Sequence, residues 1–552
     1  MKKLIFYSCL LMISILSVNA QTPNWQWAKS AGGTGSAFGL IVSTDAIGNV
    51  FMTGYFKSPT ITFGTTTLTN AGSNDVFIVK YDATGNVLWA KSVGGAYDER
   101  GQSVSTDASG NVFMTGYFIS PTISFGTTTL TNTYASNLYS DFFIVKYDTS
   151  GNVLWAKSAE GAYDDSGQSV STDASGNVFI TGIYYSPTIT FGTTTLTKAN
   201  PTSNYSDIFI VKYDASGNML WATSAEDGAF NDDGRSVSTD ASGNVLIAGY
   251  FASPTITFGT TTLTNTNSSW DIFIVKYDSS GNVLWAKSAG GTAYDIGNSV
   301  STDAIGNVFM TGIYYSPTIT FGITTLTNAN NVADIFIVKY DASGNVLWAK
   351  SAEGTWYDLS YGVCTDVIGN VFITGAFYSP TITFGTTTLT NVNAANDIFI
   401  VKYDASGNVL WAKSAGGTGY DEGYAVSTDA SGNVFLTGNF GSPNINFGTT
   451  TLTNTDTTGS FRDIFIAKLD GTTGTNDIKN ANIKIYPNPT NNIINIEGLT
   501  KNENNTIQIF DVQGKLVITK NISEKGTIDL SELNKGVYVI KIGEVAQRIV
   551  KM

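Results

Sequence analysis

The stretch that decides the fold is "DIFIVKYDSSGNVLWAKS", residues 271–288, in which two apolar segments flank a short Asp-Ser-Ser-Gly-Asn linker. Both segments are rich in β-branched and aromatic residues, which favour strands. The linker favours a tight turn, because Asp accepts hydrogen bonds from the backbone that follows it and Gly adopts a positive φ. The stretch therefore predicts a β-hairpin.

This hairpin belongs to a repeat that fills most of the chain. Copies of "DIFIVKYD" open at residues 75, 141, 207, 271, 334, 397 and 463. The tryptophans of the W-A-(K/T)-S motif stand at 27, 89, 155, 221, 285, 348 and 411, and the aspartates of "TDASGNVF" at 45, 107, 173, 240, 303, 366 and 429. Each marker occurs seven times, so internal repetition governs the architecture.

Each repeat predicts four antiparallel strands, from copies of "SVSTD", "NVFMTGYF", "DIFIVKYD" and "NVLWAKS". Apolar side chains occupy both faces of the second segment, which indicates a sheet buried on both sides. Such units predict an all-β fold, a β-propeller. Blades of about 40–45 residues are usual, so the additional "SPTITFGTTTLTN" segment predicts an extra hairpin on each blade. A solenoid or a string of β-sandwich modules is the alternative architecture.

The two ends of the repeat are incomplete in complementary ways. "NWQWAKSAGG", residues 24–33, has no "DIFIVKYD" before it, and "DIFIAKLD", residues 463–470, has no W-A-K-S segment after it. Residues 25–30 therefore supply the missing strand of the last repeat. This predicts a seven-bladed β-propeller over residues 21–470, closed by its N-terminal strand.

The N-terminus predicts export. Lys2 and Lys3 precede an apolar run over residues 4–18, and a small-residue site predicts cleavage between Ala20 and Gln21. This is the pattern of a secretory signal peptide, residues 1–20, and the run is too short for a membrane span. Cys364 is the one cysteine that follows it, so no intrachain disulfide is expected.

Composition excludes several functions. The chain has no histidine, which removes Ser-His-Asp triads and histidine zinc sites, and leaves Ca2+ with oxygen ligands as the metal to consider. The net charge is −14, and it is −18 over residues 21–476 alone. A surface this acidic disfavours nucleic acid and anionic lipid.

The loops that precede each "SVSTD" segment suggest a cation site. Six of the seven contain an aspartate near the expected channel mouth, namely Asp98, Asp164, Asp232, Asp295, Asp358 and Asp421. A ring of carboxylates there is a candidate Ca2+ site. The alternative is that each aspartate caps its own loop by accepting backbone N–H groups.

Aromatic residues in the variable loops of the same face are candidate binding residues. They are Tyr97, Tyr134, Tyr139, Tyr163, Tyr205, Trp270, Trp356 and Tyr420. Such side chains stack on sugar rings or anchor protein partners, and packing between blades is the alternative. The charged residues unique to single blades (Lys57, Arg100, Lys198, Arg235 and Arg462) are spread around the ring, so no catalytic cluster and no enzyme activity are predicted.

Two family resemblances follow from these motifs. The unit "DASGNVFMTGYF…ITFGTTTLTN…DIFIVKYDASGNVLWAKS" resembles the bacterial SBBP β-propeller repeat, which implies an extracellular binding or structural module. After a linker at residues 471–482, residues 483–552 resemble the type A C-terminal sorting domain of the type IX (Por) secretion system of Bacteroidota. The matching positions are Tyr486, Pro487, Asn488, Pro489, Gly514, Gly536, Tyr538 and Lys551.

The second resemblance implies a small Ig-like β-sandwich that addresses the protein to the outer membrane. The sequence thus predicts a secreted or cell-surface protein, without a transmembrane segment, that the type IX machinery exports. Its expected function is binding of a glycan or protein through the variable loops, in adhesion or interaction. A secreted polysaccharide-active enzyme and a passive structural protein of the envelope are the alternatives.

Overall fold

The structure is a computed structural model with two compact units, one of residues 23–472 and one formed by the strands after residue 473. It describes residues 22–551 except 160, 226–229, 266, 268, 353, 392, 394, 457–458, 472–482, 489, 500–504, 512–515, 523–524 and 543–544. The signal peptide, its cleavage site at Ala20 and Gln21, and nearly all of the linker at 471–482 lie outside the described residues.

Within the described residues, the larger unit forms seven four-stranded antiparallel sheets, numbered here in chain order and written from the innermost strand outward. Sheet 1 is β2 (Ala37–Thr44), β3 (Val50–Phe56), β6 (Asp75–Tyr81) and β7 (Val87–Val93); sheet 2 is β8 (Glu99–Thr106), β9 (Val112–Phe118), β12 (Asp141–Tyr147) and β13 (Val153–Ser158); sheet 3 is β14 (Asp165–Thr172), β15 (Val178–Tyr184), β18 (Asp207–Tyr213) and β19 (Met219–Ser224). Sheet 4 is β20 (Asp232–Thr239), β21 (Val245–Phe251), β24 (Asp271–Tyr277) and β25 (Val283–Ala289); sheet 5 is β26 (Asp295–Thr302), β27 (Val308–Tyr314), β30 (Asp334–Tyr340) and β31 (Val346–Ser351). Sheet 6 is β32 (Asp358–Thr365), β33 (Val371–Phe377), β36 (Asp397–Tyr403) and β37 (Val409–Ala415); sheet 7 is β38 (Asp421–Thr428), β39 (Val434–Phe440), β42 (Asp463–Leu469) and β1 (Trp25–Ala31).

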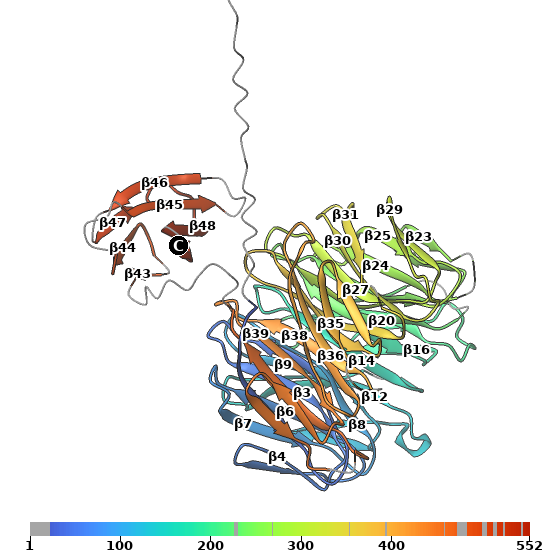
Figure 1. Cartoon of the computed structure of the whole chain (residues 1–552). Helices are drawn as coiled ribbons and strands as arrows, with labels where there is room; N and C mark the ends of the chain where they lie inside the picture. The colour runs from blue at the N-terminus through green and yellow to red at the C-terminus, as the bar shows by residue number, and fades with distance from the viewer. Residues whose placement is uncertain are drawn as a thin grey trace, which may run out of the picture. The chain divides into compact units, whose positions relative to one another are not determined.

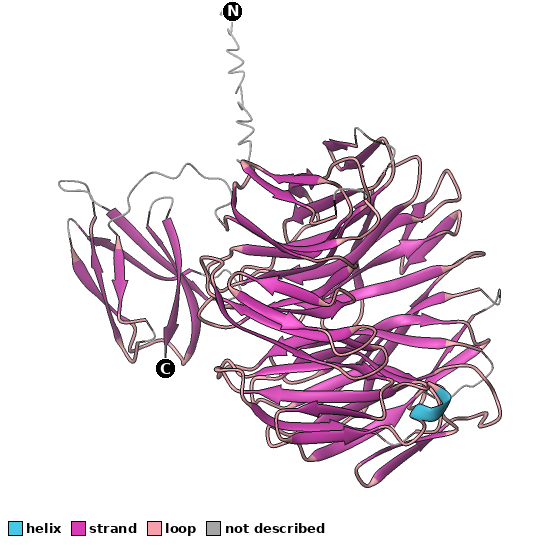
Figure 2. Cartoon of the chain, turned by 90° about the horizontal axis from the view of Figure 1, so that it is seen from below, coloured by secondary structure: helices cyan, strands magenta, loops and turns pink. Residues whose placement is uncertain are grey.

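The predicted extra hairpin is present in every repeat. The seven hairpins are β4 (Thr60–Phe63) with β5 (Thr66–Thr69), β10 (Thr122–Phe125) with β11 (Thr128–Thr131), β16 (Thr188–Phe191) with β17 (Thr194–Thr197), β22 (Thr255–Phe258) with β23 (Thr261–Thr264), β28 (Thr318–Phe321) with β29 (Thr324–Thr327), β34 (Thr381–Phe384) with β35 (Thr387–Thr390), and β40 (Asn444–Phe447) with β41 (Thr450–Thr453). One 3-10 turn, η1 (Ala135–Asn137), is the helical segment coloured cyan in Figure 2.

The core lies between neighbouring sheets. One hydrophobic cluster joins Leu246 and Ile272 of sheet 4 to Met310 and Phe336 of sheet 5, and β27 and β30 are buried along their whole length. The apolar residues on both faces of the central strands explain this packing, as predicted. The sheets stand beside one another in an all-β, propeller-like arrangement (Figures 1 and 2). Each sheet is open, and none in the described part of the chain closes on itself.

The tight turns formed by Asp-x-x-Gly-Asn have the predicted geometry. In the turn between β24 and β25, Asp278 Oδ1 accepts the N–H groups of Ser280 and Asn282 at 2.8 and 2.9 Å, and its Oδ2 accepts Asn282 Nδ2 at 2.8 Å. Gly281 has φ +88°. Both carboxylate oxygens of Asp278 accept hydrogen bonds within the turn. The structure therefore favours a structural role for this aspartate over calcium binding.

The N-terminal strand pairs with the last sheet, as the sequence predicted. β1 runs antiparallel to β42, with Trp27 opposite Lys468. Both side chains then reach sheet 1, because Trp27 Nε1 and Lys468 Nζ donate to the carbonyl oxygen of Ala83 at 3.3 and 3.0 Å. Trp285 and Lys276 do the same between sheets 4 and 5, with Ala342 as acceptor.

A ring of hydrogen bonds links the innermost strands at their C-terminal ends. Each of the seven terminal threonines donates its Oγ1 to the carbonyl oxygen of the equivalent threonine in the preceding sheet, at 2.7 to 2.9 Å; they are Thr44, Thr106, Thr172, Thr239, Thr302, Thr365 and Thr428. The bond from Thr44 to Thr428 joins sheet 1 to sheet 7. Val42 and Ile464 from these two sheets also share one hydrophobic cluster.

The C-terminal unit consists of two sheets. The first is β43 (Lys484–Tyr486), β44 (Ile493–Glu497) and β47 (Gly526–Asp529); the second is β46 (Leu516–Ile522), β45 (Asn505–Asp511), β48 (Gly536–Ile542) and β49 (Val545–Lys551). Buried isoleucines, such as Ile494 and Ile509, form one core with side chains from both sheets.

Several predicted motif residues hold the end of this unit in place. Asn488 Oδ1 accepts the N–H of Val550 at 2.8 Å, and the buried Lys551 donates its Nζ to the carbonyl oxygens of Leu530, Ser531 and Leu533. Tyr538 donates its hydroxyl to the carbonyl of Asn534 at 2.8 Å. Tyr486, Pro487 and Gly536 are described, whereas Pro489 and Gly514 lie outside the described residues.

Candidate functional site

Each sheet has two chemically different ends, here called the turn end and the loop end. The turn end carries the Asp-x-x-Gly-Asn turns. At the loop end, the loop that enters the third strand is hydrogen-bonded to the loop that enters the next sheet, as when Asp295 N–H donates to the carbonyl of Trp270 at 2.7 Å. The seventh such bond runs from Ala37 N–H to the carbonyl of Arg462. All predicted cation and loop-binding residues lie at the loop end.

Most of the predicted binding aromatics are exposed there. The exposed side chains, at 39 to 55 %, are Tyr97, Tyr134, Tyr163, Tyr205, Trp356 and Tyr420. Tyr139 packs edge-on against Tyr163, with ring centroids 5.2 Å apart. Trp270 lies between Tyr250 and Tyr294, at 4.5 and 4.8 Å. Six of the predicted side chains thus face solvent and two are involved in packing. Binding by the exposed six stays a prediction.

The sequence analysis missed three exposed aromatics in these loops. Phe230, Tyr294 and Tyr357 are 38, 52 and 40 % exposed. Each precedes the innermost strand of its sheet by one or two residues, as Tyr97, Tyr163, Trp356 and Tyr420 do. That shared position is the sequence signal that finds them.

Three arginines also lie at the loop end, each paired with an acid and placed over a tyrosine ring. Arg100 Nη2 is 3.1 Å from Asp98 Oδ2, and its guanidinium lies 4.5 Å from the Tyr55 ring centre. Arg235 Nε is 3.2 Å from Asp233. The third arginine, Arg462, pairs with Glu422 and lies over Tyr420.

Two of these arginines, Arg100 and Arg462, lie near the same tyrosine. Burial raises the pKa of Tyr55, and both Arg100 and Arg462 oppose that shift, so guanidinium groups from sheets 2 and 7 act on one tyrosine of sheet 1. Lys198 has a different role, because its Nζ donates to the carbonyl oxygens of Ser203 and Tyr205 and so holds its own loop.

The six predicted ring aspartates fall into two groups. Asp232, Asp295, Asp358 and Asp421 are the first residues of their inner strands and are buried. Asp295 is typical, since it accepts the N–H groups of Tyr315 and Ser316 at 3.1 and 3.2 Å and the Ser316 hydroxyl at 2.7 Å. This geometry supports the capping alternative for these four.

Asp98 and Asp164 stand one position earlier and do not match the other four. The equivalent residues in sheets 2 and 3 are Glu99 and Asp165, both fully buried. Asp98 accepts Asn74 Nδ2 and Ser73 Oγ, and Asp164 accepts the N–H and hydroxyl of Ser140 at 2.8 and 2.9 Å. The six predicted aspartates therefore occupy two different positions relative to the inner strands, because an aspartate after an aromatic residue does not mark strand register.

No group of three acidic, histidine or cysteine residues in the described ranges is arranged to hold a metal ion. Ca2+ binding at the loop end stays a prediction of the sequence. The acids that do come together are pairs. One member opens the third strand of a sheet and the other opens the inner strand of the next sheet.

The pKa values of these paired carboxyl groups are raised. Burial and repulsion from Asp295 raise the pKa of Asp271 to about 7, and burial raises that of Asp295 to about 6 despite its hydrogen bonds. Burial and Asp358 likewise raise the pKa of Asp334 to about 7. Asp271 Oδ1 is buried and accepts no hydrogen bond among the described residues, which disfavours its charged form.

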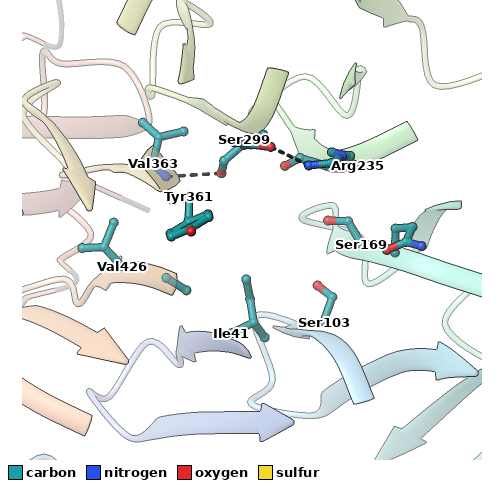
Figure 3. A pocket seen from close by; sticks show the side chains of 13 residues that line it. Ile41, Ser103, Ser169, Arg235, Ser299, Tyr361, Val363 and Val426 are labelled. Atoms are coloured by element: carbon teal, nitrogen blue, oxygen red, sulfur yellow. Dashed lines mark hydrogen bonds between the residues drawn. The ribbon is translucent and has the colours of Figure 1, made fainter. Parts of the chain in front are cut away.

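A cavity of about 100 Å³ lies between the inner strands of all seven sheets. Figure 3 shows its side chains arranged around a central space, with Arg235 on one side and Tyr361 on another. The serines on its wall, Ser103, Ser169, Ser236 and Ser299, each accept the N–H of a valine in the next sheet at 3.1 to 3.2 Å. The inner strands of the seven sheets thus line one cavity.

Cys364 is a packed side chain of the repeat unit. Its side chain packs into the cluster that contains Trp411, and burial raises the pKa of its thiol. A thiol kept protonated in this way is a poor nucleophile.

No helix within the described ranges is long and apolar enough to cross a membrane.

Comparison with known proteins identifies the C-terminal unit. Residues 484–552 match the family described as the secretion system C-terminal sorting domain. The chain therefore carries a type IX secretion sorting domain. The strands β43 to β49 are the fold of this domain, and Lys551 and Asn488 stabilise it by the contacts given above.

The chain is similar to two relatives at low identity. It is 26 % identical over 510 residues to an uncharacterized WD repeat-containing protein of Acanthamoeba polyphaga mimivirus, covering 76 % of this chain and 36 % of the relative. A regulatory protein of Caulobacter vibrioides, FlaEY, is 25 % identical over 111 residues, which is 20 % of this chain and 12 % of that protein. The chain thus spans about a third of the first relative and less of the second.

Solved structures give two further likenesses. The Pan2 WD40 domain of Neurospora crassa has a TM-score of 0.38 and 8 % identity, covering 82 % of this chain and 98 % of that one. A fungal alcohol oxidase in complex with copper has a TM-score of 0.44 and 14 % identity, covering 96 % of this chain and all of that one. Both likenesses concern the fold alone.

Proposed function

We propose that this protein is a non-catalytic β-propeller of the SBBP type, exported by the type IX machinery of a Bacteroidota cell and secreted or displayed on the surface. It binds a glycan or a protein through its loop end, in adhesion or interaction. The seven sheets are seven blades, and β1 closes the ring. The threonine ring from Thr44 to Thr428 supports closure, together with the donation of Trp27 and Lys468 to one carbonyl of sheet 1.

The observation that carries this proposal is the difference between the two ends of the sheets. The turn end repeats the same saturated turn, whereas the loop end exposes aromatic side chains on loops that differ in every repeat. Trp356, for example, is 55 % exposed. Loops that vary on a repetitive scaffold are where binding usually resides, and exposed aromatic rings supply contact area at low entropic cost.

A binding screen of the mature protein against a glycan array and against surface-protein extracts tests this function. We expect binding that Trp356→Ala and Tyr420→Ala each weaken about tenfold, as for an aromatic anchor. Thr84→Ala, at the exposed turn end, is the matched control and should bind like the wild type. Equal loss in the control would contradict the assignment to the loop end.

The same preparation distinguishes the alternatives. Release of reducing sugar from a polysaccharide panel, abolished by substitution of a single acid in one repeat, would identify a polysaccharide-active enzyme instead. A protein that binds nothing in the screen and cleaves nothing would be a structural component of the envelope. Both outcomes would overturn the proposal.

A further inference from the structure

A second cavity, here called the outer cavity, lies between the outer strands of sheets 1 and 2. Its volume is about 510 Å³, within the range of small-molecule sites. Residues 91–93 at the end of β7 form one wall, and residues 124–127 at the turn of the hairpin β10–β11 form another. Tyr147 and residues 151–153, where sheet 2 turns into β13, complete the lining. The predicted loop-binding residues are not among those that line this cavity.

Two residues of the outer cavity have no copy in the other repeats. Val93 ends β7, whereas the six equivalent positions of the other repeats hold alanine. Ser124 stands in β10, where five of the other hairpins hold threonine and the last holds Asn446. Val93 thus adds apolar surface to the wall, and Ser124 removes a methyl group from it. The junction between sheets 1 and 2 therefore differs in chemistry from its six equivalents.

Tyr147 contributes a buried polar group to this lining. The side chain is 1 % exposed, and its hydroxyl has no hydrogen-bond partner among the described residues. Burial raises the pKa of this hydroxyl, so it stays protonated and remains a hydrogen-bond donor. A buried donor without an acceptor is unfavourable, and an oxygen atom of a ligand in the cavity would satisfy it.

Lys91 supplies a positive charge to the same lining. Its Cε lies beside Gly151 of the next sheet, 2.8 Å from the position that a Cβ on this glycine would take. Within the described ranges its ammonium forms no ion pair. Asp148, the acid of the adjoining turn, uses both carboxylate oxygens within that turn, where they accept hydrogen bonds from Ser150 and Asn152. The charge of Lys91 is therefore free to meet a ligand.

We infer that the outer cavity binds a small organic carboxylate that has an apolar body. The carboxylate pairs with the Lys91 ammonium and accepts the Tyr147 hydroxyl, and such charge-assisted hydrogen bonds are strong. The apolar body packs against Val93 and Val153. A free carboxylic acid and the C-terminus of a peptide share this chemistry. The inference goes beyond the proposed function of the loop end and does not rest on it.

Ligand-observed NMR titration of the full mature chain tests the inference. The probes are hexanoate, phenylpropanoate and N-acetylleucine, each compared with its neutral amide, in physiological salt, which screens the long-range repulsion from the acidic repeats. At least one carboxylate should bind about tenfold tighter than its amide or better. Tighter binding of N-acetylleucine would identify a peptide C-terminus as the source, and tighter binding of the simple acids a free carboxylic acid. Equal binding of acids and amides, or no binding of any acid, would overturn the inference.

The variants keep the shape of the wild-type side chain or copy another repeat. Lys91→Thr copies Thr223 and should weaken binding about tenfold, and Tyr147→Phe, which removes only the unpartnered hydroxyl, about fivefold. Val93→Ala, which copies the other six repeats, should weaken it about threefold. Lys157→Thr is the matched control, because it removes the equivalent lysine from the outer strand of sheet 2, and it should leave the affinity unchanged. Affinity that is insensitive to both Lys91→Thr and Tyr147→Phe would also overturn the inference.

The loop-end variants separate this inference from the proposed function. Trp356→Ala and Tyr420→Ala should leave carboxylate binding unchanged, and Lys91→Thr should leave binding in the glycan and protein screen unchanged. A protein that binds carboxylates but nothing in that screen would support the outer cavity and refute the loop-end function. Carboxylate binding that depends on Trp356 instead of Lys91 would show that the outer cavity is not the site.

Discussion

Two aspartates bracket β24 and have opposite environments. Asp271 is the first residue of the strand, and Asp278 directly follows its last residue. Asp278 is exposed and accepts hydrogen bonds from Asn282 and Ser280, which lower its pKa. Asp271 is buried beside Asp295, and its pKa is raised to about 7. The turn end thus stabilises a negative charge, while the loop end disfavours one. The same residue type therefore supports the scaffold at one end and forms a protonatable junction at the other.

The largest expected effect comes from removing β1, which no turn connects to its partner strand β42. Deleting residues 21–33 removes β1, exposes the edge of β42 and removes the Trp27 contact to Ala83. We expect the repeat unit to lose about 3 kcal/mol or more of unfolding free energy, from one aromatic side chain and an unpaired strand. Denaturant unfolding checks this, and a deletion variant as stable as the intact protein would refute closure by β1.

The next effect comes from breaking one turn. Asp278→Ala removes the acceptor of three hydrogen bonds within the turn. Their loss should cost about 1–2 kcal/mol, as for other side-chain caps of backbone N–H groups. Asp278→Asn, which keeps one acceptor oxygen, is the intermediate control in the same unfolding measurement. No difference between alanine and the wild type would mean that the turn needs only its glycine.

The paired acids of the loop end predict that the stability of the fold increases as the pH falls from 8 to 5. The pKa values of about 6 and 7 at Asp295, Asp271 and Asp334 lie above the ordinary value of 3.8. Folding therefore takes up protons, so this contribution is complete below about pH 4 and is lost as pH rises through 6 to 7. Melting temperature should rise between pH 8 and pH 5. Below pH 4 it should fall again, because the turn aspartates, whose pKa values are lowered, then become protonated.

Asp271→Asn sharpens this test. It removes one charge from a buried pair and supplies an amide donor to Asp295, so the melting temperature at pH 8 should rise by about 2 °C, and the pH profile should flatten. Asp463→Asn is the control, because at the seventh junction Ala37 stands where the other inner strands begin with an acid. A variant whose pH profile matches the wild type would show that the pair does not govern the dependence.

The smallest effect compares two tryptophans at the turn end. Trp348 Nε1 donates to the carbonyl of Ala405 at 3.2 Å, whereas Trp411 Nε1 is buried and has no partner among the described residues. Trp348→Phe should cost about 1 kcal/mol more than Trp411→Phe, since only the first loses a hydrogen bond. Equal losses in thermal unfolding would assign the role of both tryptophans to packing alone.

The sequence identified the elements of the fold because its signals are local and repeated. Seven copies of "DIFIVKYD" specify strands, the Asp-x-x-Gly-Asn linkers specify turns, and the unpaired "NWQWAKSAGG" specifies which strand β1 joins. Six exposed aromatics were found in the same way, from their place in variable loops, whereas Phe230, Tyr294 and Tyr357 were not. The two different positions of the six loop aspartates were not foreseen, because Asp98 and Asp164 follow an aromatic residue but lie one position before the inner strand.

The sequence by itself determined that Asp271 and Asp278 bracket a strand, since composition and turn chemistry act over a few residues. Only the tertiary structure decided that one of them is buried beside a carboxyl from the next sheet while the other is saturated by its own turn. The cavity between the inner strands has the same origin. Gln168, Arg235, Asn298 and Tyr361 are separated by more than sixty residues in sequence, and the packing of successive sheets, which depends on long-range burial, brings them to one wall.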